Sequence, residues 1–258
     1  MRIGVTLPIG REVEEAAAAE AVGVPFVYVT SIPGSEAAIG AAVATSTSTT
    51  RIVVGVHIGD ENPVTLAEEI AVLDNLSNGR VAVVAQLGSL GEAAATEDVA
   101  LLRAALCGRP LGHRGERWQV PACIAGHVAP ASVLVTPGPA QLVLPIWVAG
   151  PAAAATGRSL SIPAVATETN AIQDGADVSP ARCTLGGDLD ADRQLVVEWS
   201  NAGATHLLCT LAGTADVGML ARWLIPEVGM VAFPRVVADA PEPASWPRRE
   251  TASDRSPT

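Results

Sequence analysis

The feature that most constrains the fold is a regular alternation of short apolar runs with alanine-rich helical patterns. The apolar runs are continuous, as is typical of parallel strands that are covered on both faces. In the first half of the chain these strand-like runs are residues 2–7, 25–30, 51–58 and 80–86. The helical patterns that follow them are residues 12–22, 36–45, 63–76 and 92–106.

The same rhythm returns after an interruption. Residues 108–143 are rich in Pro and Gly and predict a long, mostly irregular excursion. Four more strands are then predicted, over residues 145–149, 162–166, 181–185 and 205–211, with helices after 151, from 168, over 190–201 and over 215–224. Eight strand–helix units predict an α/β fold, a (β/α)8 TIM barrel with compressed loops, as one domain over residues 1–237. Residues 238–258 are rich in Pro, Ser and Arg and predict a disordered tail.

Composition excludes several functions. The net charge is −11, which argues against binding to nucleic acid or to anionic membrane surfaces. All 16 basic residues are arginine, so lysine cannot act as a Schiff base or a general base. Neither a signal peptide nor an apolar run long enough to span a membrane is present, which predicts a cytoplasmic protein. The four cysteines are irregularly spaced and are expected to be reduced core residues.

The carboxyl ends of barrel strands are where catalytic residues are expected. His57 ends the third strand and Ser31 the second, and both are candidate catalytic residues. A neutral imidazole can accept a proton near neutral pH or donate to a substrate oxygen. The neighbouring strand ends predict a substrate pocket formed by Leu7, Pro8, Thr30, Asp60 and Thr167. No two histidines have the spacing of metal ligands, so no metal site is expected.

A second candidate region follows the fifth strand, where Gly150 and Pro151 precede a helix. The N-terminus of a helix favours phosphate, because its N–H groups and its dipole both attract an anion. The residues that we expect to bind a cofactor here and at the end of the fourth strand are Gln86, Gly88, Ala149, Gly150 and Thr156.

Residues 62–80, NPVTLAEEIAVLDNLSNGR, resemble the signature of the luciferase-like monooxygenases. In that family a helix started by Pro leads through Leu-Asp and Ser-x-Gly-Arg into the fourth strand, matched here by Leu73, Asp74, Ser77, Gly79 and Arg80. Weaker resemblances follow in the same order as in the family, at residues 19–29, 41–56, 108–118, 145–150 and 198–211. Asp74 and Arg80 lie at the amino end of the barrel, where a structural role is expected.

The resemblance implies a bacterial-luciferase-like barrel and an oxidoreductase. With reduced FMN the enzyme would be a monooxygenase that acts on a small organic substrate. With F420 it would transfer a hydride to or from such a substrate. The resemblance also implies a homodimer and a separate flavin reductase as a partner. The chain is rich in Ala and Arg and has no Lys, which is typical of bacteria whose specialised metabolism contains many such enzymes.

The chain also departs from the family pattern. The second strand ends in Thr30-Ser31, where the family often has Asp-His, and the helix after Gly150 begins with alanines instead of hydroxyl residues. Each change removes a group that would hold a cofactor phosphate or polarise a substrate. The alternatives are therefore a cofactor-free barrel that acts as a tailoring isomerase, cyclase or hydrolase, and a non-catalytic binding partner.

Overall fold

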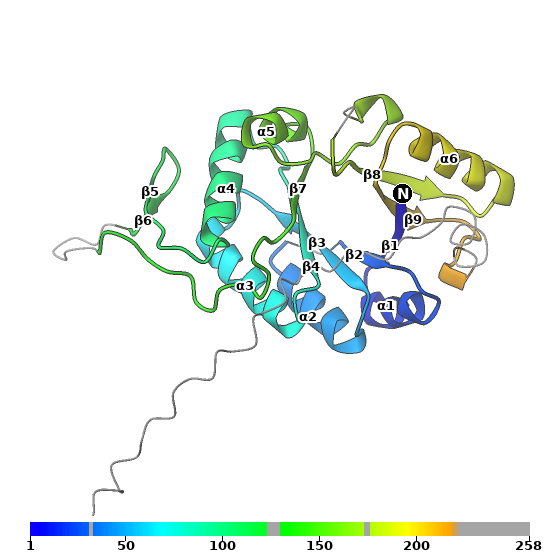
Figure 1. Cartoon of the computed structure of the whole chain (residues 1–258), viewed down its shortest axis with the longest axis horizontal. Helices are drawn as coiled ribbons and strands as arrows, with labels where there is room; N and C mark the ends of the chain where they lie inside the picture. The colour runs from blue at the N-terminus through cyan, green and yellow to red at the C-terminus, as the bar shows by residue number, and fades with distance from the viewer. Residues whose placement is uncertain (31–32, 123–129, 173–175, 219, 221–258) are drawn as a thin grey trace, which may run out of the picture.

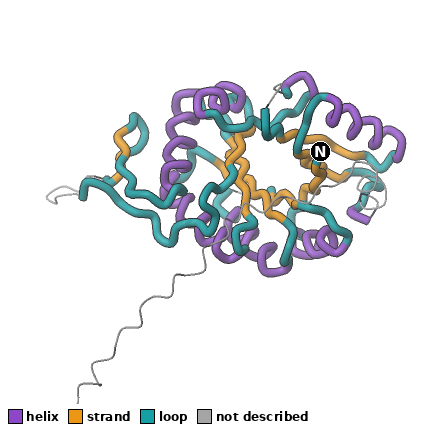
Figure 2. Tube along the Cα trace, viewed as in Figure 1, coloured by secondary structure: helices purple, strands orange, loops and turns teal. Residues whose placement is uncertain are grey.

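A computed structural model describes residues 1–30, 33–122, 130–172, 176–218 and 220. Within these residues seven parallel strands form one sheet in the order β7-β4-β3-β2-β1-β9-β8. The strands are β1 (Arg2–Thr6), β2 (Phe26–Val29), β3 (Arg51–His57), β4 (Val81–Gln86), β7 (Ile146–Ala149), β8 (Pro180–Leu185) and β9 (His206–Leu211). The sheet curls, so that its strands surround a common interior (Figure 2).

Six described helices lie outside the curled sheet (Figure 1). They are α1 (Glu12–Ala21), α2 (Glu36–Ser46), α3 (Pro63–Leu76), α4 (Glu92–Ala105), α5 (Ala153–Leu160) and α6 (Leu189–Asn201). Helix α3 has the predicted bounds, because the side chain of Asn62 accepts a hydrogen bond from the Val64 N–H at 2.9 Å and Pro63 fills the first helical position. None of the described helices is long and apolar enough to cross a membrane.

The predicted sixth strand is reduced to two isolated bridges between the edge strands. Ala164 pairs with Val148 of β7, and Ala166 pairs with Ala181 of β8, both in parallel. Pro163 contributes only its carbonyl, which accepts from the Val148 N–H at 2.9 Å. The helix predicted from residue 168 is a single 3-10 turn, η1 (Thr169–Ala171).

Residues 108–143 form the predicted excursion as far as they are described. They contain one small antiparallel hairpin, β5 (His113–Arg114) and β6 (Gln119–Val120), which projects from the α4 side of the sheet (Figure 1). Half of the helix predicted at 215–224, and the whole of the tail at 238–258, lie outside the described residues.

The cysteine prediction needs a correction. Cys209 is buried and Cys183 partly buried, but Cys107 is exposed at the end of α4 instead of lying in the core. Its thiol donates to the carbonyl of Ala104, one helical turn earlier. Residue 123, the fourth cysteine, lies outside the described residues.

Side chains alternate between the interior of the sheet and the layer under the helices. The outward set is a continuous core that joins strands to helices and includes Val54 and Val83. The interior set is a second cluster, made of Phe26, Tyr28, Val53, Ala82, Val84, Trp147, Ala149, Val165 and Leu208. At the amino end of the sheet the ring of His206 packs against Trp147, with ring centroids 5.2 Å apart. Burial, together with the nearby Arg2 and Arg51 cations, lowers the pKa of His206 to about 3, so this imidazole is a neutral packing group.

The signature residues form a polar clip at the amino end. The guanidinium of Arg80 donates five hydrogen bonds of 2.7–3.0 Å, four to backbone carbonyls and one to the hydroxyl of Thr47, which join the end of α3 to the turn between α2 and β3. Asp74 is fully buried and accepts from the backbone N–H and side-chain amide of Gln141, at 2.9 and 2.8 Å. Asp74 therefore connects the excursion to the amino end of the curled sheet, and the two signature side chains have the structural role expected of them.

Replacing Arg80 by lysine should destabilise the fold, because an ammonium offers three donors where the guanidinium uses five. We expect Arg80→Lys to lower the free energy of unfolding by about 2–4 kcal/mol, since buried carbonyls lose their partners. Urea denaturation measures this loss. Arg158→Lys, at an exposed position on α5, is the matched control and should change it by less than about 0.5 kcal/mol. Equal effects of the two substitutions would contradict the clip.

Glu20 of α1 should make stability depend on pH in the acid range. Burial by itself raises the pKa of Glu20, but hydrogen bonds from the N–H groups of Thr49, Thr50 and Ser48 outweigh it and bring the pKa down to about 2. A lowered pKa in the folded state stabilises the protein above the unfolded pKa, and this contribution disappears as the pH falls toward 2.

The variant Glu20→Gln should therefore be less stable than the wild type at pH 6, and the difference should shrink steadily below pH 4.5. Thermal unfolding at a series of pH values measures it. Glu14→Gln, at an exposed position on the same helix, is the control. A difference that stays constant from pH 6 to pH 2.5 would contradict the prediction.

Candidate functional site

Three predicted residues lie in one row at the carboxyl ends of adjacent strands. We call this end of the sheet the rim. His57 of β3 pairs in register with Gln86 of β4, and Gln86 pairs with Ala149 of β7. Because side chains alternate along a strand, His57 is on the same face of β3 as Val53, which belongs to the interior cluster. Ala149 belongs to that cluster as well. Parallel pairing has thus placed a candidate catalytic residue directly beside one candidate cofactor-binding residue, Gln86, with a second, Ala149, on the next strand.

The imidazole of His57 is oriented by a carboxylate that the sequence did not reveal. Its Nδ1 lies 2.7 Å from Oε1 of Glu36, in the first turn of α2. The Glu36 side chain is 6% exposed and that of His57 is 36% exposed, so the buried carboxylate supports a partly accessible ring. When Nδ1 donates to Glu36, Nε2 is the nitrogen that is left to accept a proton from a bound molecule.

The surroundings of this pair are acidic. Burial raises the pKa of Glu69 on α3, and the carboxylates of Glu61 and Glu36 raise it further. Three carboxyl groups therefore lie close enough to interact electrostatically on the α2–α3 side of His57.

A second polar group lies in the interior below the rim, and the sequence analysis missed it. Tyr28 of β2 is completely buried, and its hydroxyl accepts hydrogen bonds from the amide of Gln86 and from Nη2 of Arg182 on β8. Gly55 of β3 leaves room for this hydroxyl, since a Cβ at that position would lie 2.6 Å from it. Burial raises the pKa of Tyr28, and the opposing effects of Arg182 and Gln86 are smaller, so the phenol keeps its proton.

Two signals in the sequence point to this group. Tyr28 is the only tyrosine of the chain, and Arg182 is the one charged residue in the strand predicted at residues 181–185. Neither signal says that the two side chains meet, because β2 and β8 are far apart in the sequence and are not neighbours in the sheet.

The loops after β4 and β7 adjoin at two glycines. Gly88 and Gly150 have φ angles of +55° and +115°, which side chains disfavour. A Cβ at Gly150 would lie 3.6 Å from the backbone nitrogens of Leu87 and Gly88. This exposed, side-chain-free backbone is where the sequence predicts a cofactor phosphate.

Thr156 is not positioned to contact such a phosphate. It is completely buried between α5 and α4, and its hydroxyl lies 3.5 Å from that of Thr96. The first turn of α5 is Ala153-Ala154-Ala155, so this helix would present only backbone N–H groups to an anion.

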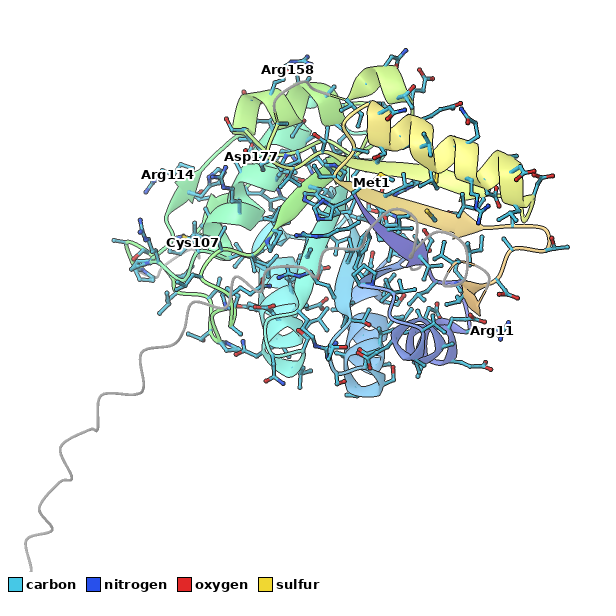
Figure 3. The ribbon with its side chains drawn as sticks, turned by 45° about the vertical axis from the view of Figure 1, so that its right-hand side comes forward. Met1, Arg11, Cys107, Arg114, Arg158 and Asp177 are labelled. Atoms are coloured by element: carbon cyan, nitrogen blue, oxygen red, sulfur yellow. The ribbon has the colours of Figure 1, made fainter. Side chains whose placement is uncertain are left out.

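The predicted substrate-pocket residues lie in three places. Leu7, Pro8 and Thr30 line one cavity of about 420 Å³ at the ends of β1 and β9, together with Thr6 and Thr210. Asp60 is exposed in the loop after β3. Thr167 lines a different cavity, of about 670 Å³, beside α5. Gly150 also lines this cavity, as does Arg158, which is labelled on α5 in Figure 3. Residue 31, the predicted catalytic serine, lies outside the described residues.

The fold is that of known cofactor-dependent oxidoreductases. A structure of an F420-dependent secondary alcohol dehydrogenase, in complex with an F420–acetone adduct, has a TM-score of 0.69 at 12% identity, over 87% of this chain and 98% of that one. The monooxygenase RslO1 from Streptomyces bottropensis has a TM-score of 0.65 at 16% identity, over 88% and 100%. The F420-dependent tetrahydromethanopterin reductase of Methanopyrus kandleri has a TM-score of 0.65 at 14% identity, over 87% and 98%.

Sequence comparison gives the family directly. A search of curated protein sequences found no match. The profile of the luciferase-like monooxygenases, however, matches residues 3–160, which is more than half of the chain and includes the signature, His57, Gln86 and Gly150. The protein belongs to the luciferase-like monooxygenase family.

Proposed function

We propose that the protein is an oxidoreductase that uses a reduced flavin or the deazaflavin F420 to oxidise or reduce a small organic substrate. The observation that carries the proposal is the rim row His57–Gln86–Ala149. In this row the imidazole of His57, oriented by Glu36, lies beside Gln86, whose amide donates to a hydroxyl in the interior. Family membership and the F420-dependent fold relatives support the same class of reaction. The bridges at Ala164 and Ala166 support the closed eight-stranded barrel that this proposal assumes.

The residues at the rim fit the ring of such a cofactor. A flavin or deazaflavin ring is flat and apolar on its faces and carries carbonyl and N–H groups on one edge. Ala149 offers a small apolar surface, and the side-chain amide of Gln86 offers a donor nearby. The cofactor phosphate would contact backbone N–H groups near Gly88, Gly150 and the first turn of α5.

When bound, the reduced cofactor would supply a hydride or, with oxygen, the oxidising equivalent. The chain's own residues provide the remaining functions. His57 would accept or return a proton through Nε2, with Glu36 holding its Nδ1. Val84 and Trp147, which are buried in the interior, would keep water away from the reacting groups.

A cofactor-free function is the second candidate, and the α5 region favours it. Thr156 is buried and the first turn consists of three alanines, so no side chain in the first turn of this helix offers a hydroxyl to a phosphate. A barrel that has lost its cofactor would still have the His57–Glu36 pair for isomerase or hydrolase chemistry.

We expect the purified protein to bind one reduced cofactor with micromolar affinity. Calorimetry with FMN, with anaerobically reduced FMN and with reduced F420 measures it and identifies which cofactor is used. Gly150→Val should weaken the binding at least tenfold, because a side chain at a φ of +115° both strains the loop and covers the backbone N–H groups. Gly108→Val, at another glycine of positive φ with open space around it, is the control for backbone strain alone. A folded protein that binds none of the three cofactors would support the cofactor-free function.

His57→Gln should lower kcat by about 100-fold or more, as expected when a general acid–base group is lost. The assay is oxidation of the cofactor that binds, with a panel of small alcohols, aldehydes and ketones. Glu36→Gln should have a smaller effect in the same direction, because the ring remains but loses its orientation. His113→Gln is a matched control, since His113 also bonds a glutamate, Glu97 at 3.1 Å, but in the excursion. Wild-type turnover by His57→Gln would remove His57 from the mechanism.

A further inference from the structure

Arg182 is an interior cation whose environment differs from that of the other arginines described above. It lies in the middle of β8, paired in register with Leu208 of β9, whose side chain belongs to the interior cluster. Its guanidinium carbon is 5.2 Å from the centre of the Tyr28 ring, and Nη2 donates to the Tyr28 hydroxyl at 3.1 Å. The guanidinium therefore extends across the interior from β8 toward β2.

The hydrogen-bonding capacity of this guanidinium is largely unused. Among the described residues no carboxylate forms an ion pair with Arg182, and its buried Nε has no hydrogen-bond partner. Arg80 uses all five of its donors, whereas one side-chain hydrogen bond is described for Arg182. A buried N–H without an acceptor destabilises a protein by about 1–3 kcal/mol, so a ligand that supplies the acceptor would gain this energy.

The neighbouring groups suit the same kind of ligand. Arg182 is half-buried, and Thr184, two residues nearer the carboxyl end of the same strand, is exposed. The buried Tyr28 hydroxyl accepts from the Arg182 guanidinium and so fixes its position. A planar guanidinium that is held in place is a donor group that binds carboxylate, sulfonate or phosphate oxygens.

We propose that Arg182, positioned by the Tyr28 hydroxyl, binds the anionic group of the substrate, so that the enzyme selects small organic acids: carboxylates, sulfonates or phosphate monoesters. One part of this inference rests on the proposed function, namely that the bound anion is the substrate of the enzyme. The binding of the anion itself does not depend on it. The cofactor phosphate is assigned elsewhere, to the glycine loops after β4 and β7, where the backbone is exposed.

The sole tyrosine of the chain gives a direct test. Protein labelled with carbon-13 at the tyrosine Cζ alone gives one labelled NMR signal, and that signal reports on Tyr28. The probes are pentanoate, pentanesulfonate and pentyl phosphate, with pentanamide as the uncharged counterpart. At least one anion should shift the signal saturably in the wild type, with an affinity at least tenfold above that of pentanamide. If none of the anions shifts the signal, or if pentanamide binds equally well, the proposal is wrong.

Two variants locate the binding. Arg182→Gln should weaken the binding of the best anion at least tenfold, whereas Arg109→Gln, at an exposed position in the loop after α4, should leave it unchanged. The wild-type comparison of anions with pentanamide decides the question even if Arg182→Gln does not fold. Unchanged binding by a folded Arg182→Gln would overturn the assignment.

A cofactor titration separates a substrate anion from a cofactor anion. The affinity of Arg182→Gln for FMN or F420 should remain within threefold of the wild-type value. A tenfold loss there would assign Arg182 to the cofactor and overturn the proposal. Because the anion titrations use the protein alone, a failure to bind any flavin or deazaflavin would refute the proposed function and leave the anion result standing.

Discussion

The alternation of side chains along parallel strands decides which residues can meet at the site. Each strand presents every second residue to the interior, and the register between strands sets the level at which it lies. His57, Gln86 and Ala149 therefore form one row without any loop having to bring them together. Below them, Gly55 leaves the space that the Tyr28 hydroxyl fills. A shift of one residue in β3 or β4 would turn this row toward the helices.

Two arginines, one at the amino end of the sheet and one in its interior, differ in how many of their donors are used. At the amino end, Arg80 is enclosed by backbone carbonyls and stabilises the junction of α3 with the turn before β3. In the interior, Arg182 has an aromatic face and one hydroxyl as its described side-chain partners. A satisfied guanidinium holds a structure together, whereas one with unused donors can recognise an anion. Arg80 of the family signature therefore has a structural role, whereas Arg182 belongs to the candidate site.

Much of the fold could be predicted because its signals are local. Asn62 and Pro63 mark the start of α3, and the apolar runs mark β3 and β4. The sixth strand is reduced to two bridges, and this depends on how the edge strands meet, not on the residues in between.

The site could be predicted only in part. His57 was found because it ends a strand, but its partner Glu36 begins a helix that precedes that strand, so only the packing brings the two together. Tyr28 and Arg182 required the register of β2 and β8 across the interior. Thr156 is the first hydroxyl residue after Gly150 in the sequence, but the orientation of α5 turns it toward α4.

The central claim is that a reduced cofactor binds at the rim, above the Tyr28 hydroxyl. The most direct measurement is the NMR signal of carbon-13-labelled Tyr28 at saturation with the cofactor that binds. An aromatic ring placed over Gln86 and Ala149 would shift this signal through its ring current, in the wild type and in Arg109→Gln alike. The account predicts that shift, with one cofactor bound per chain. Saturation with cofactor that leaves the Tyr28 signal unmoved would place the binding site elsewhere and contradict the account.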